Sequence, residues 1–548
     1  MSDSRLAVVR IEIPEKGTSF ENPRYLPMGA ASRLENFRIN QFYARSRAGS
    51  ITLLDNPDSR LVVELMNISY PDLTVETIRA SGDELYRADP GTNTWVLLVP
   101  AGAEFFDGGD KNRFWAVLAP FAGEDKGRII IGNGVNQIVT WKGGSNPYEE
   151  YAGSVPARYG IINHDFVLII ADTLEAGQRH QQRIRWTVPG LANGNALDWT
   201  GLGSGFLDLK QTPFPITAIW KQFGQTFVGC SRALLTITPT GDPLNAYFPT
   251  VLNDAEGWFA PRSLVLYGNV AAGMTHNAFS TFNGTTFEAI DGPVNLEWKK
   301  RLNYNALSQI TSAFDAKHSR VGWGLPLDGE SYPSEIWWFE THTGRWEIDK
   351  LKHTAMSIYS TAADITTIDE LAGNTIDSFA GTSIDDLSTG ARLDPLFIYG
   401  TAAGDTLQFD DTVSTDGGQE IHAVFVSPIA DVLGKDLKVA GQPRSIGAMD
   451  HLILDTIRVE LIDRGQNYSI AVDASGDGGA TWQAFGTASL ASLGPSGTDN
   501  GRIVDVAARG RMSLRDSVQI RLSNLSTGTP WGFSGITALV DVVGRKVG

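Results

Sequence analysis

The sequence predicts an all-β protein, in which a β-propeller of six to eight blades is followed by a C-terminal β-sandwich-like domain. Three observations lead to this fold class. Strand-turn-strand patterns recur about every 50 residues along most of the chain. Convincing long amphipathic helical patterns are missing between positions 30 and 420. After residue 420 the pattern changes to longer alternating strands, which indicates a separate β-domain.

The repeated element of the first region is a hairpin. Asn283-Gly284 is the strongest turn signal among these hairpins, because both residues tolerate positive φ. A blade alone leaves one apolar face that only a neighbouring blade covers, so an array of blades predicts a closed propeller over residues 31–415. A pair of β-sandwiches is the alternative architecture. The segments are the hairpins ELYRADPGTNTWVLL (84–98), QTFVGCSRALLTI (225–237), AFSTFNGTTFEAI (278–290) and EIWWFETHTGRWEI (335–348), and the outer strand GDTLQFDD (404–411).

The two ends of the chain have a different character. Residues 1–30, with Pro14, Pro23 and Pro27, predict an N-terminal extended arm. Residues 416–548 predict a C-terminal β-domain, for which the family resemblance given below implies ring or platform contacts. Its alternating segments are TIRVELI (456–462), YSIAVDAS (468–475) and SVQIRLS (517–523).

Composition and charge argue against several functional classes. The single Cys230 allows no intrachain disulfide, and the eight scattered histidines form no metal-binding motif, so no metal and no cofactor are expected. Signal-peptide and membrane-spanning patterns are missing, so we expect no membrane insertion and a chain made in the cytoplasm. The net charge is −17, with twelve carboxylates and one arginine (Arg392) in residues 361–420, whereas residues 501–548 carry seven basic and three acidic residues. This balance favours solubility over sequence-specific nucleic-acid binding.

One motif in the C-terminal domain has the Asp-box pattern, SGDGGATW (475–482), which is known from sialidases and other propellers. Ser475 and Asp477 are expected to bind turn amides, Gly478 and Gly479 to supply positive φ, and Trp482 to pack back over the loop, with Thr481 as the remaining position of the motif. Such a turn stabilises a hairpin and is not itself catalytic. With no GxSxG or Walker loop in the chain, we expect no catalytic residues and no enzyme activity.

A second motif, TIDELAGNTIDSFAGTSIDDL (367–387), repeats with a period of eight. The glycines interrupt a helix, and the period does not suit a nine-residue calcium repeat, so we interpret the segment as a structural strap with three similar turns. Each turn places an apolar pair on a partner surface and an Asp outward or in a cap. The repeated positions are Ile368, Asp369, Leu371, Ile376, Asp377, Phe379, Ile384, Asp385 and Leu387.

Several segments taken in order resemble one family, the propeller-containing tail nozzle or hub proteins of short-tailed bacteriophages, which include packaged-DNA stabilisation proteins. ENFRINQFYARSRAG (35–49) is similar to the opening signature, with Arg47-Ala48-Gly49 where Arg-Pro-Gly is usual. QRIRWTVPGLANGNALDWT (182–200) matches a motif at Trp186, Pro189, Asp198 and Trp199. The further segments are IIIGNGVNQIVTWKGG (129–144), residues 257–290 and residues 509–548.

This resemblance implies a structural virion protein of the phage tail. Such proteins assemble as a ring, usually of six copies, below the portal and its adaptor. The ring forms the distal tail tube through which DNA is retained and ejected, without sequence-specific binding, and it carries tail fibres, spikes or a tip plug. Two alternatives stay open at this point. One is a glycan-binding or sialidase-like Asp-box propeller, and the other is the tail hub of a long-tailed phage or gene-transfer agent.

Overall fold

The structure is a computed structural model. It describes the chain outside the following residues: 1–4, 24, 27–28, 40–42, 73, 90, 102–105, 107–108, 110–111, 122–123, 152, 164–165, 189–197, 360–394, 411, 433–435, 440–441, 446–450, 464–466, 492–501, 516, 526–529 and 544–548.

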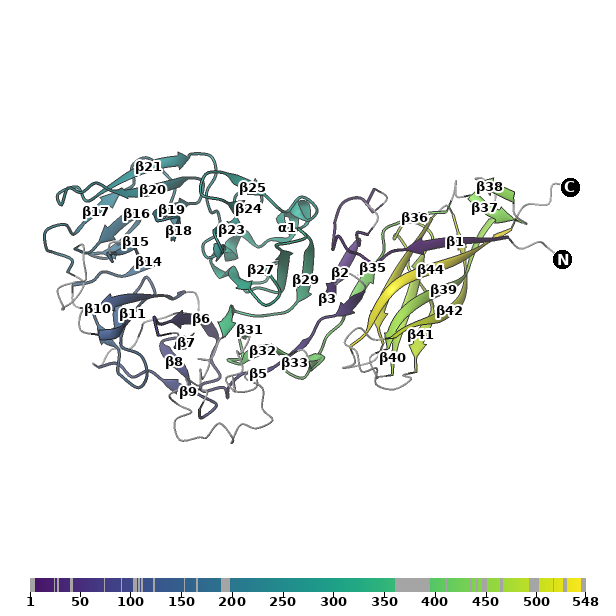
Figure 1. Ribbon diagram of the computed structural model, residues 1–548, viewed down its shortest axis with the longest axis horizontal. Helices are drawn as coiled ribbons and strands as arrows, with labels where there is room; N and C mark the ends of the chain where they lie inside the picture. The colour runs from purple at the N-terminus through teal and green to yellow at the C-terminus, as the bar shows by residue number, and fades with distance from the viewer. Residues whose placement is uncertain are drawn as a thin grey trace, which may run out of the picture.

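Seven four-stranded antiparallel units stand around a common axis and form a β-propeller (Figure 1). This number lies within the predicted range of six to eight. Blade 1 contains β6 (Val62–Ser69), β7 (Val75–Ser81), β8 (Glu84–Asp89) and β9 (Thr94–Leu97), and blade 2 contains β10 (Trp115–Phe121), β11 (Glu124–Gly132), β12 (Val139–Trp141) and β13 (Glu149–Glu150). Blade 3 contains β14 (Ala157–Ile162), β15 (Leu168–Glu175), β16 (Gln178–Trp186) and β17 (Gly205–Asp208), and blade 4 contains β18 (Ile216–Gln222), β19 (Gln225–Cys230), β20 (Leu234–Pro239) and β21 (Tyr247–Asn253).

The remaining blades follow in chain order. Blade 5 contains β22 (Val265–Tyr267), β23 (Val270–Met274), β24 (Phe279–Phe282) and β25 (Phe287–Ala289). The short helix α1 (Asn295–Arg301) and the 3₁₀ helix η2 (Tyr304–Gln309) lead to blade 6, with β26 (Thr311–Asp315), β27 (Arg320–Leu325), β28 (Glu335–Glu340) and β29 (Trp346–Lys350). Blade 7 contains β30 (Ala355–Tyr359), β31 (Leu396–Gly400), β32 (Thr406–Asp410) and β5 (Gly49–Thr52), and β33 (Thr415–Asp416) and β34 (Gln419–Glu420) extend it.

The four hairpins expected from the sequence are confirmed as β8–β9, β19–β20, β24–β25 and β28–β29. In the β24–β25 turn, Gly284 has a φ of +99°, and the Asn283 side chain accepts hydrogen bonds from the backbone amides of Thr285 and Thr286. The residues that make the turn are therefore the ones that the local sequence indicates.

Blade 7 closes the ring with a strand from the other end of the propeller. β32 is the third strand of this blade, and the fourth strand is β5, which pairs with β32 from Gly49↔Asp410 to Thr52↔Leu407. The segment 404–411, expected from the sequence to be the outer strand of a blade, is therefore its third strand, and β5 lies outside it. Local patterns do not reveal this, because the partner strand lies far away in the sequence.

Aromatic side chains fill the spaces between blades, and glycines make room for them. Between blades 4 and 5, Trp220 and Trp258 are buried with Phe282 in one apolar cluster. A Cβ atom on Gly229 would lie 2.6 Å from the Trp258 ring, so this strand position requires glycine. Close packing of large rings makes each blade a rigid wedge.

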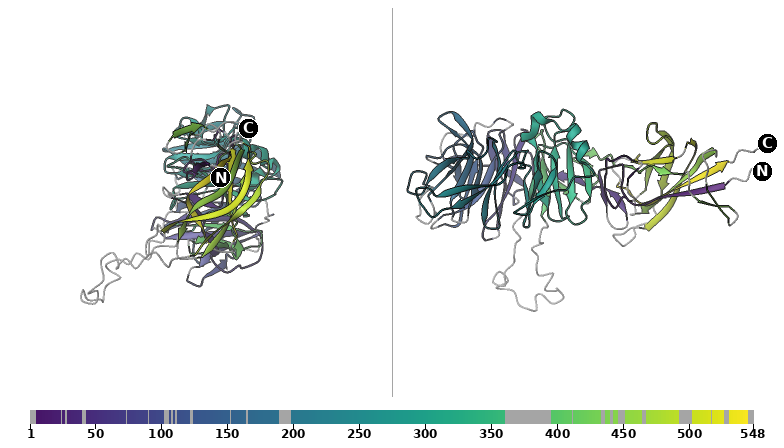
Figure 2. Two further views of the ribbon diagram at one scale, coloured as in Figure 1. Left: turned by 90° about the vertical axis from the view of Figure 1, so that its right-hand side faces the viewer. Right: turned by 90° about the horizontal axis from the view of Figure 1, so that it is seen from above.

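The remaining strands form a two-sheet sandwich next to the propeller (Figures 1 and 2). One sheet has the order β3 (Phe37–Ile39), β4 (Ala44–Ser46), β44 (Gly532–Val543), β39 (His451–Asp463) and β42 (Arg502–Leu514), with β1 (Arg5–Ile11) paired to β44. The other contains β2 (Arg33–Glu35), β35 (Val424–Val426), β43 (Ser517–Asn524), β40 (Tyr468–Ser475) and β41 (Gln483–Leu490), with β36 (Ala430–Asp431) on β43. β37 (Asp436–Val439) and β38 (Gln442–Ser445) form a separate hairpin.

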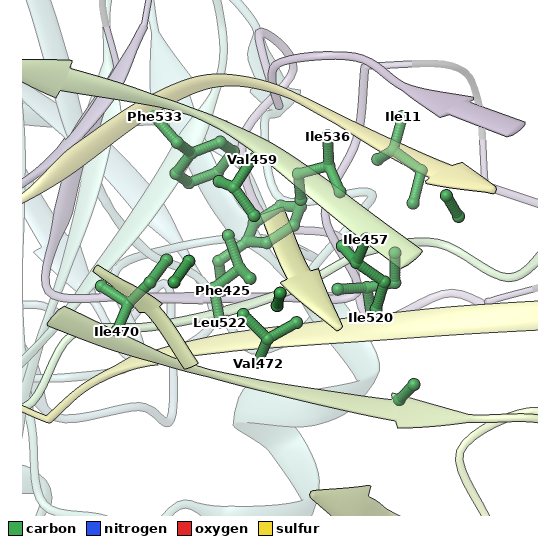
Figure 3. Packing of buried hydrophobic residues seen from close by; sticks show 14 of the residues in the cluster. Ile11, Phe425, Ile457, Val459, Ile470, Val472, Ile520, Leu522, Phe533 and Ile536 are labelled. Atoms are coloured by element: carbon green, nitrogen blue, oxygen red, sulfur yellow. The ribbon is translucent and has the colours of Figure 1, made fainter. Parts of the chain in front are cut away.

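The apolar faces of the two sheets meet in a single core (Figure 3). Ile457 and Val459 of β39 and Ile536 of β44 face Val472 of β40 and Leu522 of β43, and all five side chains are buried. The predicted strands at residues 456–462, 468–475 and 517–523 are confirmed as parts of β39, β40 and β43. The alternation of apolar and polar residues along these segments is the reason that the sequence indicated a sandwich.

The borders between the regions differ from the predicted ones at the N-terminal side. Residues 5–11 of the expected extended arm are strand β1, which pairs with β44 from Arg5↔Val542 to Ile11↔Ile536. Val9 and Ile11 are buried whereas Val8 and Arg10 are exposed, a period of two that suits an edge strand. β2, β3 and β4 also belong to the sandwich sheets, although they fall within the range 31–415 assigned to the propeller.

Candidate functional site: the junction between propeller and sandwich

Residues 33–52 connect the two bodies of the molecule. β2 pairs in parallel with β29 of blade 6 at Glu35↔Ile348 and antiparallel with β35 of the sandwich. Blade 6 therefore continues through β2 into a sandwich sheet. β4 next pairs with β44, and β5 then pairs with blade 7. These twenty residues therefore pair with the sandwich, with blade 6 and with blade 7.

Asn36 makes the turn between β2 and β3. Its φ is +57°, a left-handed conformation that Asn adopts more readily than most residues. Its side-chain Oδ1 accepts hydrogen bonds from the Lys350 backbone amide (2.9 Å) and from Arg47 Nε (3.1 Å), and its Nδ2 donates to the His422 carbonyl (2.7 Å). One amide side chain thus joins blade 6, the start of the sandwich and the neighbouring arginine.

Two arginines of this segment make buried ion pairs with distant carboxylates. Arg38 donates two hydrogen bonds to Asp349 of β29, at 2.8 and 2.5 Å. Arg47 binds both carboxylate oxygens of Asp416 on β33, one of them at 2.8 Å, and lies 3.6 Å from Asp349. The side chains of Asp349 and Arg47 are 0% and 1% exposed. Bidentate pairing of this kind fixes direction as well as distance.

A second layer of charges completes this junction cluster, which we define as Arg38, Arg47, Arg320, Arg345, Asp315, Glu347, Asp349 and Asp416. Arg320 contacts Asp315 at 2.8 Å, and Arg345 lies 3.5 Å from Glu347. Trp338 donates its indole N–H to Asp349 at 2.7 Å, and its ring lies under the Arg320 guanidinium, 4.1 Å from the ring centroid. The cluster has equal numbers of guanidinium and carboxylate groups.

The pairing decides the protonation states in the cluster. Burial by itself disfavours a charged carboxylate, but the pKa of Asp349 is lowered because Arg38, Arg47 and Arg320 surround it. Burial likewise opposes the charge of Asp315, whose pKa is nevertheless held well below its usual range by His318 and Arg320. Both carboxylates are charged at neutral pH. The cluster is suited to holding two bodies in a fixed orientation and has no group poised for acid–base chemistry.

The sequence drew attention to Arg47 and Gly49 but did not identify their partners. A Cβ on Gly49 would lie 2.3 Å from the Thr415 carbonyl oxygen, so β5 and β33 approach too closely there for any larger residue. Asp349 and Asp416 are more than 300 positions away from the arginines that they bind. In a chain with 62 carboxylates, no local signal distinguishes these two.

The Asp-box residues lie in the turn between β40 and β41, on the sandwich. Ser475 Oγ accepts from the Gly479 amide at 2.8 Å, and Asp477 accepts from the Thr481 amide and hydroxyl at 2.9 and 2.6 Å. These bonds from Thr481 lower the pKa of Asp477 to about 2. The Trp482 ring packs under Arg521, 4.9 Å from its guanidinium carbon. The turn is separate from both the junction and the propeller axis.

The other expected positions are only partly described. Trp186 on β16 is buried and donates to the Gly203 carbonyl at 2.9 Å, while Asp198 accepts from the amides of Thr200 and Gly201. Trp199 is buried beneath Arg185, whose guanidinium lies 5.6 Å from the ring centroid. These three residues support blade 3. Pro189 and all nine positions of the eight-residue repeat lie outside the described residues.

The described part of the chain holds no group of three His, Cys, Asp or Glu side chains arranged to bind a metal ion. Cys230 is buried in blade 4, where burial raises the pKa of its thiol to about 12. Among the described residues, the helices are too short or too polar to cross a membrane.

No family model matches the sequence, and no curated protein matches it. Among solved structures, YCF48 from Cyanidioschyzon merolae is similar at 11% identity and a TM-score of 0.37, covering 67% of this chain and 100% of that chain. An inactive virginiamycin B lyase from Staphylococcus aureus has 8% identity and a TM-score of 0.38, covering 66% and 98%. The AfRom2 CNH domain has 8% identity and a TM-score of 0.36, covering 66% and 99%. Similarity at this level carries no information about what this chain binds or does.

Proposed function

We propose that this chain is a structural protein of a bacteriophage tail, in which copies join into a ring that forms the distal tail tube or nozzle. The observation that supports this proposal best is the junction. Residues 35–49, which resemble the opening signature of the tail nozzle family, are the residues that fix the propeller to the sandwich through the buried ion pairs of Arg38 and Arg47. A chain built as one rigid unit suits a ring that retains DNA and later conducts it.

The ring requires two different contact surfaces on each copy, because head-to-tail contacts close into a cycle only if unlike faces meet. The basic edge strand β42 supplies one candidate surface. Arg509, Arg511 and the adjacent Arg515 are exposed along it, at the edge of the sandwich. We propose that this strand contacts an acidic surface of the next copy or of the portal-adaptor protein, and that the outer surface of the ring carries a fibre, spike or tip plug.

Assembly tests the proposal directly. The full chain, with a mass of 59.4 kDa, is purified and examined by mass photometry and cryo-electron microscopy. We expect a closed ring, with six copies as the leading expectation. A chain that stays monomeric at all concentrations, and is not found in virions by mass spectrometry of the parent phage, would contradict the proposal.

Charge reversal then tests the contact surface. The double substitution R509E/R511E should reduce the assembled fraction strongly, because two repulsive charges replace two attractive ones at an interface. Arg60, just before β6 of blade 1, has an exposed side chain paired with Asp83. R60E is therefore a control that makes the same Arg→Glu change at one site, with half the charge change of the double variant. If R60E also fails to assemble, or if both variants assemble normally, the contact between copies does not depend on β42.

A further inference from the structure

A cavity of about 200 Å³ lies where the blades meet at the propeller axis. Arg113, just before β10, and Arg158 and Tyr159 on β14 form part of its wall, together with Arg262 before β22 and Ser308 before β26. These residues come from blades 2, 3, 5 and 6. Side chains from blades so far apart around the ring meet only near its centre, where small ligands bind in closed β-structures.

Arg113 places a fixed positive charge in this wall. Its guanidinium donates to the Val63 carbonyl, to the Thr354 carbonyl at 2.7 Å and to the Gln309 carbonyl at 3.0 Å, and so joins three blades. Its Nε–H has no hydrogen-bond partner within the described part of the chain. Burial without a paired carboxylate lowers the pKa of Arg113 to about 10, which still leaves it charged at neutral pH.

The other two guanidinium groups have carboxylate partners, but only Arg262 has one to itself. Arg262 pairs with Glu64 at 2.7 Å. Arg158 lies 3.3 Å from Asp172, but that carboxylate is shared with Arg179 at 3.6 Å. Three arginines therefore line the cavity, whereas only one carboxylate, Glu64, is paired with a single arginine and a second, Asp172, is shared with Arg179. An excess of positive charge in a recess attracts anions, because the low-dielectric walls reduce screening.

Neutral hydrogen-bond donors complete the wall. Asn112 and Ser308 contribute an amide and a hydroxyl group. Tyr159 contributes a phenol, and burial raises its pKa to about 12, so the hydroxyl keeps its proton at neutral pH. Planar guanidinium forks together with such donors match the oxygens of a carboxylate or a phosphate.

From this geometry we infer that the axial cavity is a binding site for a small oxyanion, a carboxylate or a phosphate group. The volume is below the range of about 300–1,000 Å³ that is usual for drug-sized ligands, so the ligand is small. Two of the three arginines retain exposed surface and are accessible to it, since the Arg158 and Arg262 side chains are 52% and 22% exposed. The inference does not depend on ring assembly.

Isothermal titration calorimetry of the full chain tests it with three probes: inorganic phosphate, citrate and neutral glucose, at an ionic strength held constant with NaCl. We expect phosphate or citrate to bind with one-to-one stoichiometry per chain and glucose to give no heat. R158Q and R262Q should each weaken binding about ten-fold or more, because each removes a charge-assisted hydrogen bond. Arg60 has the same side-chain exposure as Arg158, 52%, and lies outside the cavity, so R60Q should bind like the unmodified chain.

The comparison between the two anions identifies the ligand class, since stronger binding of phosphate or of citrate assigns a phosphate or a carboxylate ligand. If neither anion binds, the inference is overturned. It is equally overturned if both bind R158Q as tightly as the unmodified chain, because the anion would then lie elsewhere. R158Q alters a half-exposed side chain, so it decides the question even if R262Q fails to fold.

Discussion

Arginine side chains gather at two places in this molecule, and the two groups are balanced differently. In the junction cluster four carboxylates balance four guanidinium groups, as in the pairs Arg38–Asp349 and Arg47–Asp416. In the axial cavity, Arg113 binds only backbone carbonyls, and Arg158 shares its carboxylate with Arg179. Each group contains a buried guanidinium, Arg47 at the junction and Arg113 at the cavity, so burial alone does not separate them.

The difference shows that the balance of charges around a buried arginine indicates its role. The junction cluster has four guanidinium and four carboxylate groups, so it carries no excess charge that would attract a ligand. Removing one member leaves an isolated charge in a medium that solvates it poorly. An incompletely paired cluster beside a cavity has binding capacity that the chain itself does not use. The junction therefore holds the fold together, whereas the cavity is the place where a ligand is expected.

The largest expected effect comes from breaking the junction. Asp349→Ala should lower the free energy of unfolding by about 3–5 kcal/mol, because Arg38 and Arg47 lose their shared buried partner. Urea denaturation followed by tryptophan fluorescence measures the change. Asp83→Ala is the matched control, since Asp83 pairs with Arg60 at the surface with a half-exposed side chain, and it should cost at most about 1 kcal/mol. Equal costs for the two variants would contradict the structural role of the cluster.

A smaller effect is expected from pH. His353 is buried between Thr311 and the Leu351 carbonyl, and burial lowers its pKa to about 4. The folded protein therefore binds this proton more weakly than the unfolded chain, whose histidine pKa is about 6.5. Stability should fall as pH drops from about 6.5 to 4, by on the order of 3 kcal/mol. Denaturation curves at a series of pH values measure this slope.

A substitution separates this histidine from the junction carboxylates. His353→Gln should make the free energy of unfolding less dependent on pH between pH 6.5 and 4. The lowered pKa values of Asp315 and Asp349 act in a different window, because their contribution is complete above the unfolded carboxyl pKa of about 4 and is lost as pH falls further. The variant should therefore still lose stability below pH 4, as the unmodified chain does. If the pH dependence of stability above pH 4 is unchanged in the variant, His353 is not its cause.

The smallest effect is expected for a carboxylate that has only local partners. Asp477→Ala removes the bonds to Thr481 in the Asp-box turn but leaves no buried charge behind. We expect a small decrease in melting temperature, less than for Asp349→Ala, together with unchanged assembly and unchanged anion binding. Differential scanning calorimetry measures the first, and the assays described above measure the other two. A loss of anion binding in this variant would show that the turn does more than stabilise a hairpin.

The sequence by itself determined the local structure. Alternating residues with a period of two indicated β40 and β43, and Asn283-Gly284 indicated the β24–β25 hairpin. The hydrogen-bonding residues of the Asp-box turn also lie next to one another in the chain. These features follow from the sequence because strand period and turn chemistry depend on neighbouring residues only.

The tertiary structure alone decided which distant segments meet. The place of β1 beside β44, the closure of blade 7 by β5 and the pairing of Arg38 with Asp349 all join residues from distant parts of the chain. The axial cavity likewise takes its wall from four blades. Many strands and many carboxylates would satisfy the same local rules, so the choice among them is made only when the whole ring and sandwich pack together.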